Sequence, residues 1–248
     1  MRPPPTPEPM PSSPSLSVRT FQLSGALLFA VALGAVGYAY VVRFGARAAA
    51  SDATAARVAW NVATFTVFAL HHSVLARTRL KRRLHARVGT EVERTSYVVI
   101  ASVLLLACLL TWQPLPGTWW ALPQGWHWIG YAVQLAGVAV TLVAARAIDI
   151  RELAGVKAAP TPQPHDQPRS LETRGVYGLV RHPIYFGWVL MMAGAPVMTS
   201  TRLLFAVVSI AYLAVAIPLE ERSLVEHFGE PYRAYQRQVR WRMVPGVY

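Results

Sequence analysis

The sequence predicts an all-α fold: a polytopic membrane bundle of about six spanning helices, followed by a C-terminal amphipathic helix. The first observation is composition, since 54% of the 248 residues are hydrophobic and only 15% are charged, whereas soluble domains carry about 25% charged residues. The second is that the apolar residues are gathered in runs that are almost free of charge. These runs are Phe21–Val42, Ala56–Ala76, Tyr97–Trp112, Trp128–Ala145, Ile184–Met198 and Leu203–Pro218.

The lengths of these runs set the number of spans. A bilayer-spanning helix needs roughly 17–25 apolar residues, and four of the runs meet this length. Tyr97–Trp112 is slightly short, and Ile184–Met198 is the shortest and contains Gly187, Gly194 and Pro196. We expect the last two runs to form a tight hairpin that turns at Thr199–Arg202. The alternative is that the fifth run is a re-entrant segment, which leaves five spans.

The N-terminal segment differs from the rest of the chain. Residues 1–18 include seven prolines and few large apolar groups, so they cannot bury enough surface to fold and are predicted to form a disordered tail. The run Phe21–Val42 is too long for a signal-peptide core and is interpreted as a retained anchor. The chain is thus divided into the tail 1–18, an N-terminal transmembrane region 19–128 and a C-terminal transmembrane core 129–248.

The net charge of +12 does not indicate nucleic-acid binding, because of where the charge lies. Positive charge gathers in Arg77–Arg94, Arg146–Arg181 and Arg222–Arg242, whereas the connection Gln113–His127 has no charged residue. Basic connections stay on the cytoplasmic side. The pattern therefore predicts a bacterial inner-membrane protein with both termini in the cytoplasm, attracted to anionic lipid. Three arginines in the first outer connection do not fit this pattern: Arg43, Arg47 and Arg57.

With this topology, the polar residues near span ends converge on the cytoplasmic face. Ionisable groups near membrane depth are costly and commonly functional. His71 and His72 are adjacent and point about 100° apart on a helix, so one faces a site and the other a neighbouring helix or headgroups; bland structural roles are the alternative for both. No two histidines have the HxxxH spacing of a di-iron enzyme, and Cys108 is the only cysteine, so no metal site is predicted.

The segment after the sixth run is predicted to be amphipathic. Leu224, Val225 and Phe228 share one helical side, and Gly229 then ends the helix. The stretch "YRAYQRQVRW" places Tyr232, Tyr235 and Val239 at spacings of three and four. This pattern is typical of a helix that lies on the membrane surface. The alternative is that the segment covers whatever binds at "EE", residues 220 and 221.

The ordered motifs "RGVYGLVRHPIYFGW", a hydrophobic hairpin and "EERSLVEHFGEPYRAYQRQVRWRMVP" resemble the C-terminal core of the isoprenylcysteine carboxyl methyltransferase-like superfamily, which includes membrane phospholipid methyltransferases. This resemblance covers Arg174–Pro245. The stretches "HHSVLARTRLKRRL", "ERTSYVVIASVLLL", "TWQP" and "IDIRELAG" resemble the bacterial branch of methanethiol S-methyltransferases and NnrU-like membrane proteins. Together the resemblance covers roughly residues 60–245.

The resemblance implies S-adenosylmethionine as cofactor, bound without a Rossmann-type domain. Arg181 or His182 is expected to meet the cofactor carboxylate, and Glu220 or Glu221 to accept from its ribose or ammonium group. Pro183 suits the first helical turn. The residues that the resemblance assigns to the cofactor pocket are Tyr177, Arg181, His182, Pro183, Tyr185, Gly187, Glu220 and Glu221.

The resemblance to the bacterial branch implies a small thiol, such as methanethiol, as methyl acceptor. We assign His72, Arg146 and Asp149 to the acceptor side, with His72 as base or substrate contact. A longer lipophilic acceptor, such as a prenylcysteine carboxylate or a phospholipid amine, is the alternative. A further alternative from another class is a non-catalytic NnrU-like accessory protein of nitrogen-oxide metabolism.

Overall fold

We describe the chain from a computed structural model, which describes residues 15–50, 52–75, 90–147 and 171–248. Within these residues the fold is helical, as predicted, with the addition of a small two-stranded sheet. The elements are α1 (Leu16–Val41), η1 (Arg43–Gly45), α2 (Thr54–Leu75), α4 (Thr90–Thr111), β1 (Thr118–Ala121), η2 (Gln124–Trp126), α5 (His127–Ala145), η3 (Gly175–Gly178), α7 (Pro183–Ala193), β2 (Val197–Thr199), α8 (Ser200–Phe228) and α9 (Glu230–Gln238).

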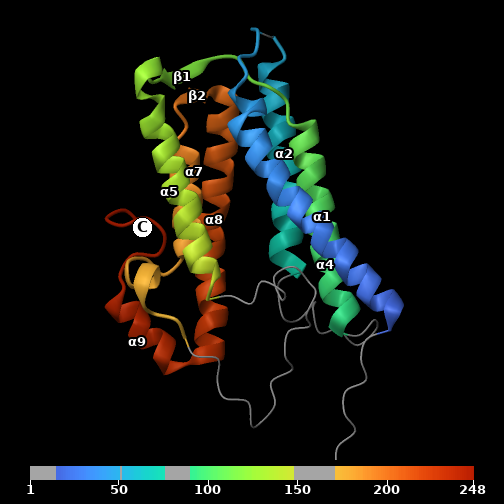
Figure 1. Cartoon of the computed structure of the whole chain (residues 1–248), viewed down its shortest axis with the longest axis vertical. Helices are drawn as coiled ribbons and strands as arrows, with labels where there is room; N and C mark the ends of the chain where they lie inside the picture. Colours follow the sequence, from blue (N-terminus) through green and yellow to red (C-terminus); the bar gives the residue numbers. More distant parts are fainter. Residues whose placement is uncertain (1–14, 51, 76–89, 148–170) are drawn as a thin grey trace, which may run out of the picture.

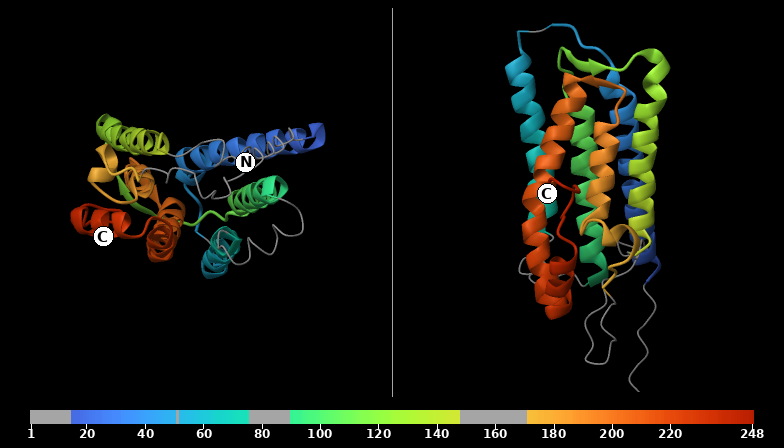
Figure 2. Two further views of the ribbon diagram at one scale, coloured as in Figure 1. Left: turned by 90° about the horizontal axis from the view of Figure 1, so that it is seen from below. Right: turned by 90° about the vertical axis from the view of Figure 1, so that its left-hand side faces the viewer.

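The long helices form two groups that stand side by side (Figures 1 and 2). The N-terminal group contains α1, α2 and α4, and the C-terminal group contains α5, α7 and α8. We call the end of the bundle that carries β1 and β2 the strand end, and the end where α8 leads into α9 the site end. Near the strand end the groups meet in a shared hydrophobic core, in which the rings of Phe44, Phe65 and Trp112 all contact Phe205. This core joins the two groups near the strand end, and a different set of interactions holds the site end together.

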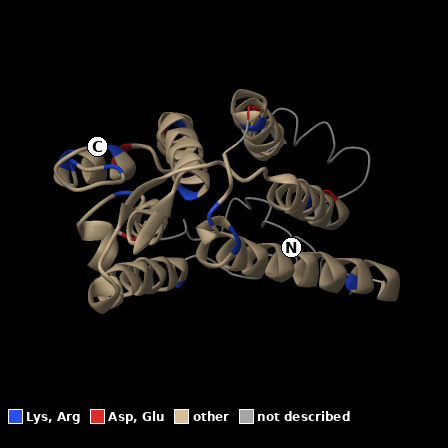
Figure 3. Ribbon diagram, turned by 90° about the horizontal axis from the view of Figure 1, so that it is seen from above, with Lys and Arg blue, Asp and Glu red and all other residues tan. Residues whose placement is uncertain are grey.

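The predicted runs correspond to α1, α2, α4, α5, α7 and α8. Four stretches of the described residues are long and apolar enough to cross a membrane: Leu16–Gly45, Val92–Thr111, Gln124–Ala145 and Ser200–Phe228. Along these helices charged residues are few, so most of the ribbon is tan in the view along the bundle (Figure 3). Helix α2 has 22 residues, and α7 is a shorter apolar helix of 11 residues. The polytopic helical architecture is therefore confirmed.

The fifth run is only partly helical. Helix α7 ends at Ala193, and the chain then passes through Gly194 and Pro196 into β2, which pairs antiparallel with β1. The connection to α8 lies earlier than predicted: it spans Gly194–Thr199, whereas Ser200–Arg202 already form the first turn of α8. Thr199 is the N-cap of this helix, and its Oγ1 accepts a hydrogen bond from Arg202 N at 3.2 Å. The sheet was not predicted; proline and glycine after Ala193 stop the helix, and β1 supplies partners for the extended backbone.

The start of α1 corrects the predicted tail. The helix begins at Leu16, and Ser15 caps it by accepting a hydrogen bond from Val18 N. Three residues of the segment 1–18 therefore belong to the first helix. Residues 1–14 lie outside the described residues.

Glycines allow α5 and α7 to pack with their backbones in contact. Each helix presents two glycines seven residues apart, Gly130 and Gly137 on α5 and Gly187 and Gly194 on or next to α7. A Cβ atom on Gly137 would lie 2.5 Å from the carbonyl oxygen of Gly187 and 2.7 Å from the backbone nitrogen of Met191. In a membrane the hydrophobic effect does not drive helices together, because lipid tails are as apolar as the side chains. Small residues at a helix crossing let the two backbones approach closely, and van der Waals packing then holds the helices together.

Arginines near the strand end are explained by helix termini rather than by topology. The guanidinium group of Arg43 donates to the carbonyl oxygens of Leu109, Leu110 and Trp112, and Arg57 donates to that of Pro114. The buried guanidinium of Arg202 donates to Tyr40, Val41 and Val197. The last carbonyls of a helix have no partner within the helix, so these cations satisfy the ends of α1 and α4.

Replacing Gly137 by alanine is expected to destabilise the protein, because the added methyl group meets the backbone of α7. Overpacking of this kind costs about 1–3 kcal/mol, and thermal unfolding of detergent-purified protein will measure it. Gly34→Ala on α1 is the matched control, since a Cβ there has no neighbour within 4 Å and alanine is the better helix former. Equal melting temperatures for both variants would contradict the backbone contact.

Candidate active site

The segment before α7 is paired with the C-terminal segment. The backbone N–H of Arg181 donates to Trp241 O at 2.9 Å, and that of His182 donates to Arg242 O at 2.8 Å. Pro183 is the first residue of α7, as predicted, where its missing N–H costs nothing. The RHP motif is thus fixed between the end of the chain and the start of a helix.

Arg181 and Glu221 form a buried ion pair at the centre of the site end. Arg181 Nε lies 2.6 Å from Glu221 Oε1, and the two side chains are 6% and 5% exposed. Nη1 of the same guanidinium donates to the carbonyl oxygens of Val239 and Arg240 at 2.6 and 3.0 Å. Since these partners occupy Nε and Nη1, the geometry makes Arg181 a clamp between α8 and the C-terminal segment.

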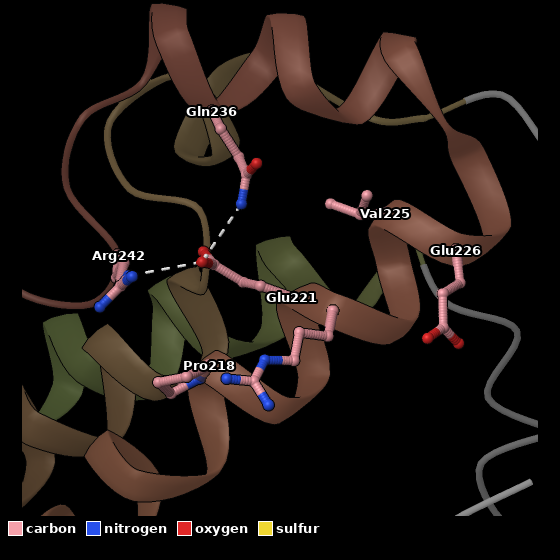
Figure 4. Close-up of a pocket in the computed structure, with 7 residues that line it drawn as sticks. Pro218, Glu221, Val225, Glu226, Gln236 and Arg242 are labelled. Carbon is pink, nitrogen blue, oxygen red and sulfur yellow. Dashed lines mark hydrogen bonds and ion pairs between the residues drawn. The ribbon is translucent and has the colours of Figure 1, made fainter.

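The second oxygen of Glu221 faces another set of groups (Figure 4). Glu221 Oε2 lies 3.3 Å from Gln236 Nε2 on α9 and 3.3 Å from Arg242 Nε. These residues line a pocket of about 450 Å³ together with Pro218, Arg222, Val225 and Glu226. The pocket walls carry both charge signs, a lining suited to a zwitterionic ligand.

His182, Tyr185 and Glu220 form a second cluster on the other side of Glu221. The rings of His182 and Tyr185 stack at 5.4 Å with an interplanar angle of 5°, and Tyr185 OH donates to Glu220 Oε2 at 2.9 Å. His182 Nε2 is 3.4 Å from Glu221 Oε1, but it is buried and makes no hydrogen bond with the described residues. Glu220 is 44% exposed. An unpaired imidazole nitrogen beside a half-exposed carboxylate is available to a polar ligand.

Helix α9 covers this site, which corrects the membrane-surface interpretation of the C-terminal segment. Tyr232 and Tyr235 are 1% and 3% exposed, and they pack with Val239 against Leu224 and Val225. The apolar face of the amphipathic helix therefore faces the protein, as expected if the segment covers the site at Glu220 and Glu221. The hydroxyl of Tyr232 is buried without a partner among the described residues; burial raises its pKa, so the hydroxyl stays protonated and can donate.

The remaining cofactor candidates serve the surrounding structure. Tyr177 donates through its hydroxyl to Ala144 O at 3.2 Å, and its carbonyl accepts from Tyr235 OH at 2.7 Å, so it joins the end of α5 to α9. The backbone of Gly187 is approached closely by α5, through Gly137. The roles of these two residues in cofactor binding stay predictions.

The structure describes two of the three acceptor-side candidates, and these lie on or next to different helices. His72 lies on α2, where its Nδ1 is 2.9 Å from Tyr97 OH. Arg146 follows the last residue of α5 and is exposed. Asp149 lies outside the described residues. Their catalytic roles therefore stay predictions.

Sequence reasoning missed several residues of the site. Gln236 and Arg242 line the pocket beside Glu221, and Tyr97 and Tyr212 contact His72. Both residues lie within the motif stretch "EERSLVEHFGEPYRAYQRQVRWRMVP", but neither was assigned to the cofactor pocket. The sequence shows that this segment is rich in polar side chains. It does not show which of these side chains face Glu221. Within the described residues no group of three or more His, Cys, Asp or Glu side chains is arranged to hold a metal ion.

Comparison with known proteins identifies the family. Residues 126–231 match the family model described as phospholipid methyltransferase. Methanethiol S-methyltransferase 1 of Bradyrhizobium diazoefficiens is 36% identical over 189 residues, which cover 75% of this chain and 66% of the relative. Methanethiol S-methyltransferase of Mycobacterium tuberculosis is 34% identical over 215 residues, which cover 85% of this chain and 87% of the relative.

A shorter match extends to a second group of methyltransferases. Protein-S-isoprenylcysteine O-methyltransferase of Dictyostelium discoideum is 32% identical over 81 residues, which cover 32% of this chain and 34% of the relative. No solved structure matches the chain significantly. The near-complete coverage of the mycobacterial relative and the match to the phospholipid methyltransferase model agree with the motifs around Arg181 and Glu221. The chain therefore belongs to the methanethiol S-methyltransferase family, within the isoprenylcysteine carboxyl methyltransferase-like superfamily.

Proposed function

We propose that this protein is an integral membrane methyltransferase that transfers a methyl group from S-adenosylmethionine to a small thiol such as methanethiol. The relatives named methanethiol S-methyltransferase support the reaction class. The observation that carries the proposal is the buried imidazole of His182, whose Nδ1 lies 3.6 Å from Glu220 and whose Nε2 lies 3.4 Å from Glu221 without a hydrogen bond among the described residues. We also propose that the site end faces the cytoplasm of a bacterial inner membrane, because the basic segments Arg77–Arg94 and Arg146–Arg181 follow α2 and α5 in sequence, and the last turns of these helices lie at the site end (Figure 1).

The residues present fit the polar groups of S-adenosylmethionine. Its ammonium and ribose hydroxyls need acceptors, which Glu220 and Glu221 offer, and its carboxylate needs donors, which His182, Gln236 and Arg242 offer. Tyr232 OH is a further buried donor without a partner in the described part of the chain. Because Arg181 Nε and Nη1 are bound to Glu221 and to two backbone carbonyls, we assign this residue to holding Glu221 in place rather than to cofactor contact.

When bound, the cofactor supplies a methyl group already activated by a sulfonium. The residues of the chain then have to align the acceptor and exclude water. Helix α9 covers the site from the aqueous side, and α7 and α8 form the apolar wall. The ion pair between Arg181 and Glu221 keeps the carboxylate at a fixed position, so little reorganisation is needed when ligand arrives.

A thiol acceptor also needs a proton acceptor, because the thiolate is the nucleophile. His72 is our candidate for this role. Arg146 and Asp149 remain candidates for contact with the acceptor. A lipophilic acceptor of the prenylcysteine type is not preferred, since the isoprenylcysteine relative matches over a third of its length only.

Calorimetry with S-adenosylmethionine and S-adenosylhomocysteine on the detergent-purified full chain tests the proposal. We expect both ligands to bind, and the protein to produce a thioether when a small thiol is added. Folded protein that binds neither ligand would contradict the proposal and would favour the non-catalytic accessory reading.

Replacing Glu220 by glutamine removes a charged acceptor without breaking the Arg181 pair. We expect the affinity for S-adenosylmethionine to fall about 10- to 100-fold, the scale of one hydrogen bond to a charged group, with little change in melting temperature. Glu230→Gln is the matched control, because Glu230 is 63% exposed on α9 and pairs with Arg233 and Arg237. An unchanged affinity in Glu220→Gln would remove this carboxylate from the binding site.

Replacing Glu221 by glutamine is expected to lower stability as well as binding. Arg181 would then be a buried cation without its carboxylate, and breaking such a pair costs roughly 3–5 kcal/mol. Thermal unfolding followed by circular dichroism will measure this loss beside Glu220→Gln. If Glu221→Gln melted at the same temperature as the parent protein, the ion pair between Arg181 and Glu221 would not contribute to stability.

A further inference from the structure

Tyr97 of α4 lies between the two adjacent histidines of α2. Its ring stacks on His71 at 5.7 Å and 13°, and lies 5.8 Å from the ring of His72. Its hydroxyl is 2.9 Å from His72 Nδ1 and 3.2 Å from the backbone oxygen of His72. One hydroxyl group thus makes two contacts with the same residue.

These two contacts define the protonation of the ring. The hydroxyl of Tyr97 has a single proton, and a backbone carbonyl oxygen can only accept. Only one arrangement of protons makes both contacts hydrogen bonds. In it, the hydroxyl of Tyr97 donates its proton to His72 O, and Nδ1–H of His72 donates to the tyrosine oxygen. With Nδ1 protonated in a neutral ring, Nε2 carries the lone pair.

The same geometry distinguishes His72 from His71. His72 is exposed, whereas both ring nitrogens of His71 are buried and without hydrogen bonds among the described residues. His72 thus presents exposed surface to a neighbouring molecule, whereas the nitrogens of His71 do not. The ring of His72 is also held from two further sides, by Phe68 at 5.6 Å and by Tyr212 at 6.5 Å.

Tyr212 connects His72 to the proposed cofactor site. Its hydroxyl is 3.1 Å from Ser73 Oγ on α2, although Tyr212 belongs to α8. On the same helix, Glu220 accepts a hydrogen bond from Tyr185 OH at 2.9 Å. Helix α8 therefore carries both a contact to the ring of His72, through Tyr212, and the carboxylate pair of the proposed cofactor site.

We propose that Tyr97 is a positioning residue that holds His72 in the Nδ1–H tautomer, so that His72 Nε2 accepts the proton of the acceptor thiol. This inference rests on the proposed function. The thiol gives its proton to Nε2, and the sulfur lone pair forms the new bond to the methyl carbon. The bond from that carbon to the donor sulfonium breaks, its electron pair stays on the donor sulfur, and His72 later releases its proton to water. The surrounding aromatic rings suit a small apolar thiol, since sulfur packs well against them.

Two thiols of similar size test this role: ethanethiol, which is protonated at neutral pH, and 2,2,2-trifluoroethanethiol, which is much more acidic. A base is needed for the first and is nearly dispensable for the second. We expect His72→Ala to lower kcat for ethanethiol about 100-fold or more and Tyr97→Phe to lower it about tenfold, the scale of one hydrogen bond. Both variants should lower kcat for trifluoroethanethiol by much less, and both should bind S-adenosylmethionine like the parent protein. Tyr38→Phe is the matched control, because Tyr38 is 64% exposed on α1.

The outcomes separate this inference from the proposed function. Parent protein that binds no S-adenosylmethionine would overturn the proposed function and the role of His72 with it. Parent protein that binds the cofactor and methylates both thiols, with variants that affect the two thiols equally or not at all, would overturn only the role of Tyr97 and His72. Nitrogen-15 chemical shifts of His72 give a second test that does not depend on turnover: the Nδ1–H signature is expected in the parent protein and its loss in Tyr97→Phe, and an Nε2–H signature in the parent protein would refute the proposal.

Discussion

The ion pair between Arg181 and Glu221 is the interaction on which the site end depends. Two charges that are nearly inaccessible to solvent remain stable only when each has its full set of partners. Arg181 finds them in Glu221 and the carbonyls of Val239 and Arg240, and Glu221 finds them in Arg181, Gln236 and Arg242. This network joins the loop before α7, the last third of α8, helix α9 and the C-terminal segment into one unit, although Arg181 and Arg242 are 61 positions apart in sequence.

Within each motif, neighbouring residues have different partners. Arg181 and Glu221 share one ion pair, whereas His182 and Glu220, next to them in sequence, keep an unpaired nitrogen and a half-exposed carboxylate. On α8, adjacent residues point about 100° apart, so Glu221 is buried while Glu220 is half-exposed. Arg181 and His182 precede the first residue of α7, and there the hydrogen bonds to the C-terminal segment set their directions. Each motif thus contributes one residue to the buried ion pair, and the binding role of its neighbour stays a prediction.

The two helix groups contribute differently to the proposed reaction. The C-terminal group carries the residues proposed for the methyl donor, and the N-terminal group carries His72 and Tyr97 on α2 and α4. The groups are joined by the aromatic core near the strand end and by the contact of Ser73 with Tyr212 near the site end. Close packing of α5 on α7 through paired glycines makes the C-terminal group a rigid support for its half of the site.

The sequence by itself determined the membrane-helical fold, the six apolar runs and the family, because apolar run length and ordered motifs are properties of the chain alone. It also named His72, His182 and Glu220 as candidates, and their roles stay predictions. Only the tertiary structure decided their partners: that Arg181 is bound to Glu221, that Gly187 faces α5, that Arg43 and Arg202 satisfy helix ends, and that Tyr97 orients His72. The physical reason is that these contacts join residues 25 to more than 160 positions apart, so they depend on how the helices pack, and no local pattern of residues specifies that packing.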